Sequence, residues 1–178
     1  MKARLAIGLA AVLVLALPFA ANAALPSAGS TLIVPNKSIG GVKLGSSLAA
    51  ATTAWGRGGT CGVSGCSYTA AQGHGGTASF LVAATVTGGP EKVVSVAVEA
   101  GLPGNTGKRN FNTPISRFKT ANGIGVGSTV SQLRHAYPHL TKRAANYYVI
   151  LGPAVTFTGF GILEGRVENI KMQDVQLG

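Results

Sequence analysis

Two stretches of the chain share one pattern of apolar and polar positions. Residues 41–55 align without gaps on residues 123–137, and apolar positions match apolar positions. In each stretch a glycine turn is followed by a hydroxyl residue, Ser47 or Thr129, which can cap the first turn of a helix. Three apolar residues then recur at the i, i+3 and i+7 spacing of an amphipathic helix. The pattern therefore predicts one short helix in each copy.

The two predicted helices also share their stop signals. Gly56 follows the first helix and Pro138 follows the second, and both residue types end helices. Thr129 and Gln132 have the spacing of a capping box. Each apolar stripe ends in an aromatic residue, and the stripes consist of Leu48, Ala51 and Trp55 in the first copy and Val130, Leu133 and Tyr137 in the second.

Strand patterns follow each helix. Residues 92–98 match residues 166–172 in their basic and apolar positions, again without gaps. Each copy is thus predicted to contain a helix and three strands joined by short turns, and we expect an α+β fold. In this fold two tandem repeats each carry a helix on one face of a three-stranded antiparallel sheet. The other strands are predicted at residues 78–86, 147–151 and 154–160 and, more weakly, at 67–70.

The repeat sets the expected domain organisation. The chain has 178 residues, of which 46% are hydrophobic, which suits a single core. Residues 24–104 are predicted to form the first repeat, including a loop with both cysteines, and residues 105–178 the basic linker and the second repeat. The first copy holds eight more residues between its helix and its last strand. The cysteine loop and residues 73–76 are the expected places for them.

The segment before Ala24 is typical of an export signal. Lys2 and Arg4 precede an apolar run at residues 5–19, and alanines follow at positions 21 and 23. This order is that of a secretory signal peptide (residues 1–23) cleaved after Ala23. A membrane anchor is the alternative, but the run is shorter than the roughly 20 residues that span a bilayer. We therefore expect a secreted, periplasmic or cell-envelope protein without a stable membrane anchor.

Cys61 and Cys66 are the two cysteines of the chain. In an oxidising compartment they are expected to form a disulfide with each other. A redox pair or half of a zinc site is the alternative. The spacing is not Cys-x-x-Cys, however, and the sequence offers no second pair of ligands. We expect a disulfide, no metal and no cofactor.

The chain is strongly basic, and the excess is local. Fifteen Lys and Arg against five acidic residues give a formal charge of +10, and removal of residues 1–23 leaves +8. No acidic residue lies between Glu99 and Glu164. This stretch is expected to attract an acidic exported protein or an anionic envelope polymer, whereas export disfavours nucleic acid. The alternative is that the charge only keeps the protein soluble. The candidate anion- or partner-binding residues are Lys108, Arg109, Arg117, Lys119, Arg134, Lys142 and Arg143.

No set of residues predicts catalysis. His135 and His139 are four residues apart, but Pro138 breaks the helix between them, so we expect both to face solvent. His74 lies in a glycine-rich loop without an acidic neighbour in sequence. The glycines of residues 123–127 lack the lysine and the spacing of a phosphate-binding loop. We therefore expect a protein that is not an enzyme.

The glycine turn before each helix resembles a known family motif. In that motif an apolar residue and a glycine precede a pair of hydroxyl residues. The motif occurs twice in this chain, at residues 44–47 and 126–129, and Ile39, Val42 and Ile124 match it further. The pattern resembles the BamE/SmpA-OmlA superfamily of small envelope modules. Two copies in tandem resemble the arrangement of beta-lactamase inhibitory protein-like exported proteins. The usual Met of the motif is serine in both copies. The resemblance implies a non-catalytic module that binds another macromolecule through its sheet face or loops.

These observations lead to one functional hypothesis and two alternatives. The hypothesis is a secreted, non-enzymatic binding module for an envelope component or another exported protein. Tyr147 and Tyr148 are neighbours in a predicted strand, so one of them should face outward as a contact residue. The first alternative is an inhibitor of a secreted enzyme. The second is an uncharacterised hydrolase that uses His74, His135 or a glutamate.

Overall fold

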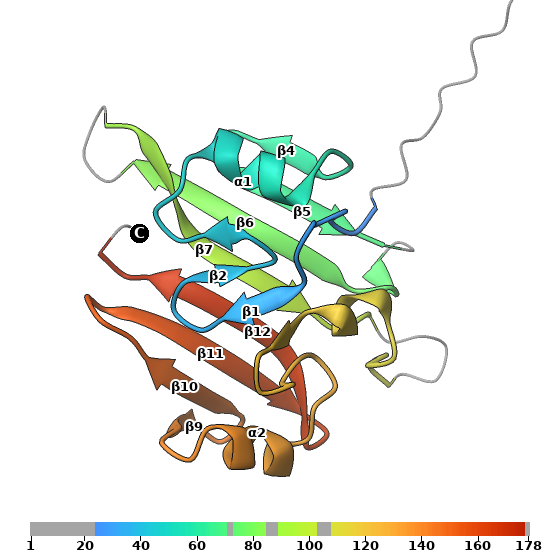
Figure 1. Ribbon diagram of the computed structural model, residues 1–178. Coiled ribbons are helices and arrows are strands. Elements are labelled where there is room, and N and C mark those ends of the chain that lie inside the picture. Colours follow the sequence, from blue (N-terminus) through green and yellow to red (C-terminus); the bar gives the residue numbers. More distant parts are fainter. Residues whose placement is uncertain (1–23, 71–72, 85–88, 103–107, 177–178) are drawn as a thin grey trace, which may run out of the picture.

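The computed structural model describes residues 24–70, 73–84, 89–102 and 108–176, so the predicted signal peptide (1–23) lies outside the described residues. The chain forms an eight-stranded sheet and a four-stranded sheet (Figure 1). The helices are α1 (Leu48–Trp55), the 3-10 helix η2 (Pro114–Arg117) and α2 (Val130–Ala136). The small sheet has the order β3 (Val42–Lys43), β2 (Ser38–Ile39), β1 (Leu32–Val34) and β8 (Lys119–Thr120).

The large sheet is antiparallel throughout and contains strands from both copies. Its order is β4 (Thr60–Gly62), β5 (Gly65–Thr69), β6 (Thr77–Ala84), β7 (Glu91–Glu99), β12 (Arg166–Asp174), β11 (Thr156–Leu163), β10 (Tyr147–Leu151) and β9 (Thr141–Ala144).

The predicted α+β class, with three strands in each copy, is wrong. The fold is mostly β, because each copy contributes four strands to the large sheet and the segments before the helices form the second sheet. The additional strands of the large sheet are β4 and β9, which lie at its two edges. Their side chains are largely exposed, so neither strand shows the apolar alternation by which strands are recognised in a sequence. The two predicted helices are confirmed.

The two copies are related by a local twofold arrangement at the centre of the large sheet. Strands β7 and β12 pair in antiparallel fashion, and Ala97 lies opposite Lys171. These two residues occupy equivalent positions in the sequence repeat, in which Lys92 aligns with Arg166. On either side Val96 faces Met172 and Val98 faces Ile170. The two copies therefore share one continuous sheet.

The glycine turn before each helix is fixed to the last strand of its own copy by the same pair of hydrogen bonds. In the first copy the Gly45 amide donates to the Val93 carbonyl, and the Val93 amide donates to the carbonyl of Ser46, both over 2.8 Å. In the second copy Gly127 and Ser128 make the same two bonds with Val167, again over 2.8 Å. The repeat found in the sequence thus has one backbone geometry.

The connections between strands account for most of the extra residues of the first copy. Strand β5 is followed by residues 70–76 and β6 by residues 85–90, whereas the matching connections of the second copy are only 152–155 and 164–165. The cysteine hairpin is not longer than its counterpart, because β5 and β10 begin at the same distance from their helices. Its prediction as an insertion site is therefore wrong.

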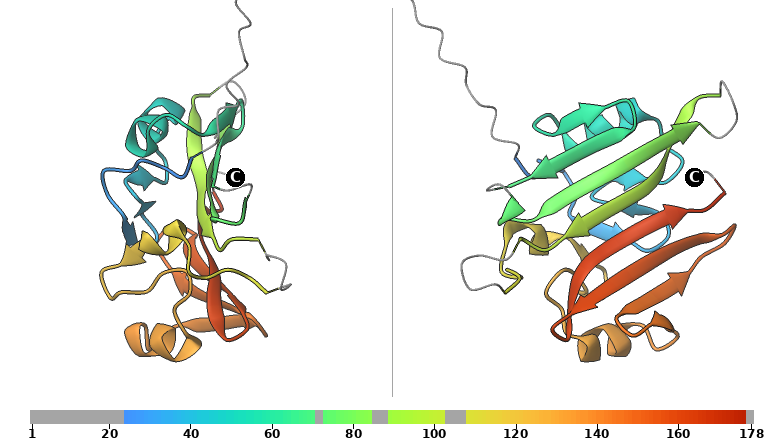
Figure 2. Two further views of the ribbon diagram at one scale, coloured as in Figure 1. Left: turned by 90° about the vertical axis from the view of Figure 1, so that its right-hand side faces the viewer. Right: turned by 180° about the vertical axis from the view of Figure 1, so that it is seen from behind.

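The molecule has two layers (Figure 2). Both α-helices and the small sheet lie on one side of the large sheet, and the view from behind shows the strands of the large sheet in front. The core lies between the layers. Trp55 is fully buried there, against the rings of Tyr68, Phe80 and Phe118 at centroid distances of 5.4, 5.6 and 6.5 Å. Its indole N–H donates to the carbonyl of Ile39 over 3.1 Å, which ties α1 to the small sheet.

Alkaline conditions are expected to destabilise this fold. Burial raises the pKa of the Tyr68 hydroxyl above its ordinary value of 10.0, and this hydroxyl donates to the carbonyl of Gly56. Ionisation is thus easier in the unfolded chain than in the folded one. The stability that Tyr68 contributes is fully present below the pKa of its hydroxyl in the unfolded chain. It is lost as the pH rises through the higher pKa of the hydroxyl in the folded chain. Urea unfolding between pH 8 and 11 should therefore show a decline from about pH 10 that is shallower in Tyr68→Phe. An equally steep decline in that variant would contradict the assignment.

Candidate partner-binding surface

The large sheet turns one face away from the helices. Along each strand the side chains alternate, so the neighbours of the core residues Phe80, Val96, Val98, Ile170 and Met172 point to this other side. The strand register places these residues in three rows across six strands, which we call the open face, although Ser95 (5% exposed) and Val149 (4% exposed) in these rows are buried by their neighbours. The rows are Thr69, Thr77, Glu99, Asn169, Gly161 and Tyr147; Ser67, Ser79, Ala97, Lys171, Gly159 and Val149; and Gly65, Leu81, Ser95, Gln173, Phe157 and Leu151.

Both α-helices and the small sheet lie on the other side of the large sheet and leave the open face uncovered (Figure 2). Among the eighteen residues of the three rows, Glu99 and Lys171 are the two with a charged side chain. Glu99 is paired with Arg109 at 3.4 Å, whereas Lys171 has no ion pair among the described residues. Most other members are small, namely glycine, alanine, serine or threonine.

Apolar and aromatic side chains gather on the second-copy half of the open face. Leu151 is 58% exposed, and it lies opposite Phe157 on the next strand. Tyr147 projects from the same strand as Leu151 and covers Gly159, where a side chain would collide with the tyrosine hydroxyl. Burial in this position raises the pKa of Tyr147. The prediction that one of the two adjacent tyrosines faces outward is confirmed, since Tyr148 is buried in the core.

The seven predicted basic residues lie on several different elements, and two of them, Arg109 and Arg117, make contacts within the chain. Arg109 is held by two carboxylates, with its Nε 2.8 Å from Glu168 and its Nη2 3.4 Å from Glu99. Its side chain is 20% exposed. Because Glu99 ends β7 and Glu168 lies in β12, the arginine connects the last strands of the two copies. Lys108, its neighbour in sequence, is exposed.

Removal of Arg109 is expected to destabilise the fold, whereas removal of Lys108 is not. Arg109→Ala leaves Glu168, whose side chain is only 17% exposed, without a cation and close to a second carboxylate. We expect the free energy of unfolding to fall by about 1–3 kcal/mol. Lys108→Ala should change it by less than about 0.5 kcal/mol, as is usual at exposed sites. Urea denaturation measures both values, and equal stability of the two variants would contradict the structural role of Arg109.

Arg117 also makes contacts within the chain. Its Nη2 donates to the carbonyl of Pro26, and its guanidinium lies 5.2 Å from the ring centre of Phe118. The residue therefore ties the segment before β1 to η2. The remaining four predicted residues are exposed, and they lie on β8 (Lys119), on α2 (Arg134) and on the edge strand β9 (Lys142 and Arg143). Charged residues on an edge strand also prevent unwanted pairing with other chains.

The histidines lie at separate places. The His74 Nδ1 is 3.4 Å from the carbonyl oxygen of Leu102, and both residues are outside the open face. His135 and His139 are exposed, and His135 lines a shallow cleft with Asn122 and Gln132. Within the described ranges, no group of three or more His, Cys, Asp or Glu residues is placed to hold a metal ion.

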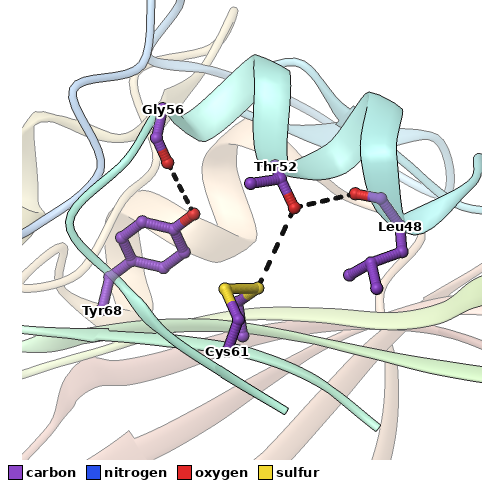
Figure 3. Close-up of a disulfide and its surroundings, with 6 residues drawn as sticks. Leu48, Thr52, Gly56, Cys61 and Tyr68 are labelled. Carbon is purple, nitrogen blue, oxygen red and sulfur yellow. Dashed lines mark hydrogen bonds between the residues drawn. A yellow bond between two sulfur atoms is a disulfide. The ribbon is translucent and has the colours of Figure 1, made fainter. Parts of the chain in front are cut away.

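The predicted disulfide is present, and it joins two neighbouring strands. Cys61 of β4 and Cys66 of β5 lie directly opposite each other, and both sulfurs face α1 (Figure 3). The hydroxyl of Thr52 lies 4.0 Å from the Cys66 Sγ and donates to the carbonyl of Leu48. The bridge thus fastens the edge strand beneath the first helix. The tip of this hairpin exposes Val63 (85%).

The family resemblance implied a sheet face or loops, but the sequence did not show which residues form the open face. Its residues are spread over six strands, and only the strand register brings them into rows. One signal was present in the sequence, namely the small residues Ser79, Ala97, Gly159 and Gly161, which alternate with core residues. Small outward residues in strands leave room for another backbone or side chain to approach closely.

Comparison with known proteins adds no relative. No protein-family model, curated protein or solved structure matches this chain. Within the part of the chain that the structure describes, no helix has the length and apolar character needed to cross a membrane.

Proposed function

We propose that the protein is an exported, non-enzymatic binding module whose open face binds another exported protein. The observation that carries this proposal is the group of apolar and aromatic side chains on the open face, where Leu151 is 58% exposed and lies opposite Phe157. Among the eighteen residues of the three rows, Lys171 is the one charge without an ion pair to a described residue. Exposed apolar side chains that gather in a patch mark interaction sites.

The partner is a folded protein with an apolar surface that carries a carboxylate. Leu151, Phe157 and Tyr147 supply the apolar contact, and aromatic side chains are enriched at the centre of interfaces. The cation of Lys171 lies at the middle of the face, next to the small residues Ala97 and Gly159. A carboxylate on the partner would pair with it. The positive charge of the rest of the molecule favours approach of such a partner.

Export of the protein belongs to this proposal. The Cys61–Cys66 disulfide supports it, because such bonds persist in oxidising compartments. The resemblance to the BamE/SmpA-OmlA superfamily stays a prediction and agrees with a binding role. If residues 1–23 form a cleaved signal peptide, the exported protein should begin at Ala24. Mass spectrometry of the protein secreted by cells that express the full chain measures this, and an intact Met1 on that protein would contradict it.

Site-specific photo-crosslinking tests the proposed interface. A photoreactive phenylalanine analogue replaces Phe157 on the open face in one variant and the exposed Ser131 on α2 in the control. Both full-length variants are expressed in the cells that make the protein and are irradiated. We expect one exported protein to be crosslinked at position 157 and not at 131. Excess unlabelled protein should suppress the product, and Leu151→Asp in the same chain should abolish it.

Three results would contradict the proposal. The first is the same set of products at both positions, which indicates unspecific contact. The second is a product that joins two copies of this chain, which makes the open face a dimer interface. The third is the absence of a specific product at position 157.

A further inference from the structure

A polar cleft on the other side of the molecule lies outside the open face. It is open to solvent, has a volume of about 500 Å³ and is lined by η2, the glycine turn before α2 and the start of β12. Lys119 extends from β8 at its rim, and Arg166 comes from the first position of β12. Its other polar side chains are those of Asn112, Ser116, Ser128 and Gln132.

The cleft carries two cations and no acidic side chain. Neither Lys119 nor Arg166 has a carboxylate within 4.0 Å among the described residues, where both recorded ion pairs belong to Arg109. Glu164, the acid nearest to Arg166 in sequence, is exposed in the β11–β12 turn and does not line the cleft. Two unneutralised cations beside one cleft attract an anion.

The arginine is held in place by the backbone around it. Its Nη1 donates to the carbonyl of Gly127 over 2.9 Å. The strand on which it lies is fixed by the amide of Val167, which donates to Ser128 over 2.8 Å, and by the carbonyl of Gly165, which accepts from Val130 over 3.0 Å. Arg166 is exposed, and its one hydrogen bond orients the guanidinium while the other N–H groups stay available for a ligand. A fixed guanidinium fork suits an oxyanion, because it donates two hydrogen bonds at once.

The side-chain amide of Gln132, which also lines the cleft, is oriented so that its N–H groups can donate to a ligand. In the capping box of α2 the Oε1 of Gln132 accepts from the backbone amide of Thr129 over 2.8 Å. Its acceptor is thus used within the chain, and the two hydrogens of its Nε2 remain for a ligand. Asn112 and Ser116 stand on the η2 side of the same cleft.

We propose that this cleft binds a tetrahedral oxyanion of the phosphate type through Lys119 and Arg166. The ligand is either free inorganic phosphate or the phosphate ester of a larger molecule, since both present the same oxygens. The site goes beyond the proposed partner-binding function, because none of the open-face residues lines it.

The first copy supplies a matched control. Lys92 aligns with Arg166 in the strand repeat, and Lys37 meets Lys119 when the alignment of residues 41–55 on 123–137 is extended toward the N-terminus. Lys37 lines a different cleft that also contains the carboxylate of Asp174. The double variant Lys37→Ala/Lys92→Ala therefore removes the same formal charge from the molecule without altering the proposed site.

Calorimetric titration of the purified protein with sodium phosphate and with glycerol 3-phosphate, at constant ionic strength in chloride, tests the site. We expect saturable binding of at least one of the two probes. Lys119→Ala/Arg166→Ala should weaken it by about tenfold or more, and Lys37→Ala/Lys92→Ala by less than about twofold. Tighter binding of inorganic phosphate identifies the free ion as the ligand, and tighter binding of glycerol 3-phosphate identifies an ester.

Two outcomes would overturn the proposal. One is the lack of saturable binding of both probes. The other is an equal loss of affinity in the two double variants, which indicates attraction by the total charge only. Thermal unfolding of each variant checks that it is folded. If the double variant is unfolded, Lys119→Ala replaces it, because this side chain is exposed and its removal should still weaken binding by several-fold.

Discussion

Replacing Trp55 by alanine is expected to lower the free energy of unfolding by about 3–5 kcal/mol, which is a large part of the about 5–15 kcal/mol that a domain usually has. The side chain is fully buried and packs against three other rings. It also donates to the carbonyl of Ile39 in the small sheet. Its removal leaves a cavity at the point where α1, the small sheet and the large sheet meet, and it leaves a buried carbonyl without its donor.

The second copy provides the comparison. Tyr137 occupies the position equivalent to Trp55 but lies just beyond α2, is partly exposed and has its ring centre 6.1 Å from that of Phe160. We expect Tyr137→Ala to cost about 1–2 kcal/mol, because less apolar area is lost and part of the space is open to water. Urea unfolding followed by circular dichroism measures both variants. A larger loss in Tyr137→Ala than in Trp55→Ala would contradict this description of the core.

Replacing both Leu151 and Phe157 by alanine is expected to weaken partner binding by about 100-fold. The two side chains lie opposite each other on β10 and β11, and Leu151 is largely exposed in the isolated chain. A loss of about 1.4 kcal/mol for each of the two side chains is a moderate contribution for interface residues, and together it corresponds to about 100-fold in affinity. The fold should change little, because neither residue belongs to the core. Affinity is measured with the protein identified by crosslinking at position 157.

The exposed cations form the control for this measurement. Arg134→Ala, Lys142→Ala and Arg143→Ala should each change the affinity by less than about threefold at about 0.15 M salt, and should mainly slow association at low salt. Arg109 and Arg117 are unsuitable for such a control, because both make contacts within the chain. A triple variant of the exposed cations that loses more affinity than the Leu151/Phe157 pair would place the interface on the basic edge instead.

Some features of the fold could be predicted from the sequence because they depend on residues that are close together in the chain. The helix starts at Ser47 and Thr129 follow from local capping, and in both cases the side chain accepts from the third backbone amide of the helix. The pairing of Cys61 with Cys66 was predictable because they are the two cysteines of a chain with an expected export signal. The outward position of one of two adjacent tyrosines follows from the alternation of a strand.

Other features depend on contacts that the local pattern does not encode. The edge strands β4 and β9 are held mainly by pairing with one neighbour, so their exposed residues gave no strand signal. The small sheet arises from the parallel pairing of β1 with β8, which are far apart in sequence. The role of Arg109 depends on Glu99 and Glu168, which come from different copies. The open face likewise exists only once six strands are in register.

Lysine acylation with and without the bound partner tests the open face most directly. Lys171 lies at the centre of the open face, whereas Lys142 lies on the edge strand β9 and Lys37 on the opposite side of the molecule. Mass spectrometry compares the rate at which each is modified. We expect the partner to slow the modification of Lys171 by about tenfold or more and to leave Lys142 and Lys37 within about twofold. An unchanged rate at Lys171, together with protection of Lys142 or Lys37, would contradict the assignment of the open face as the interface.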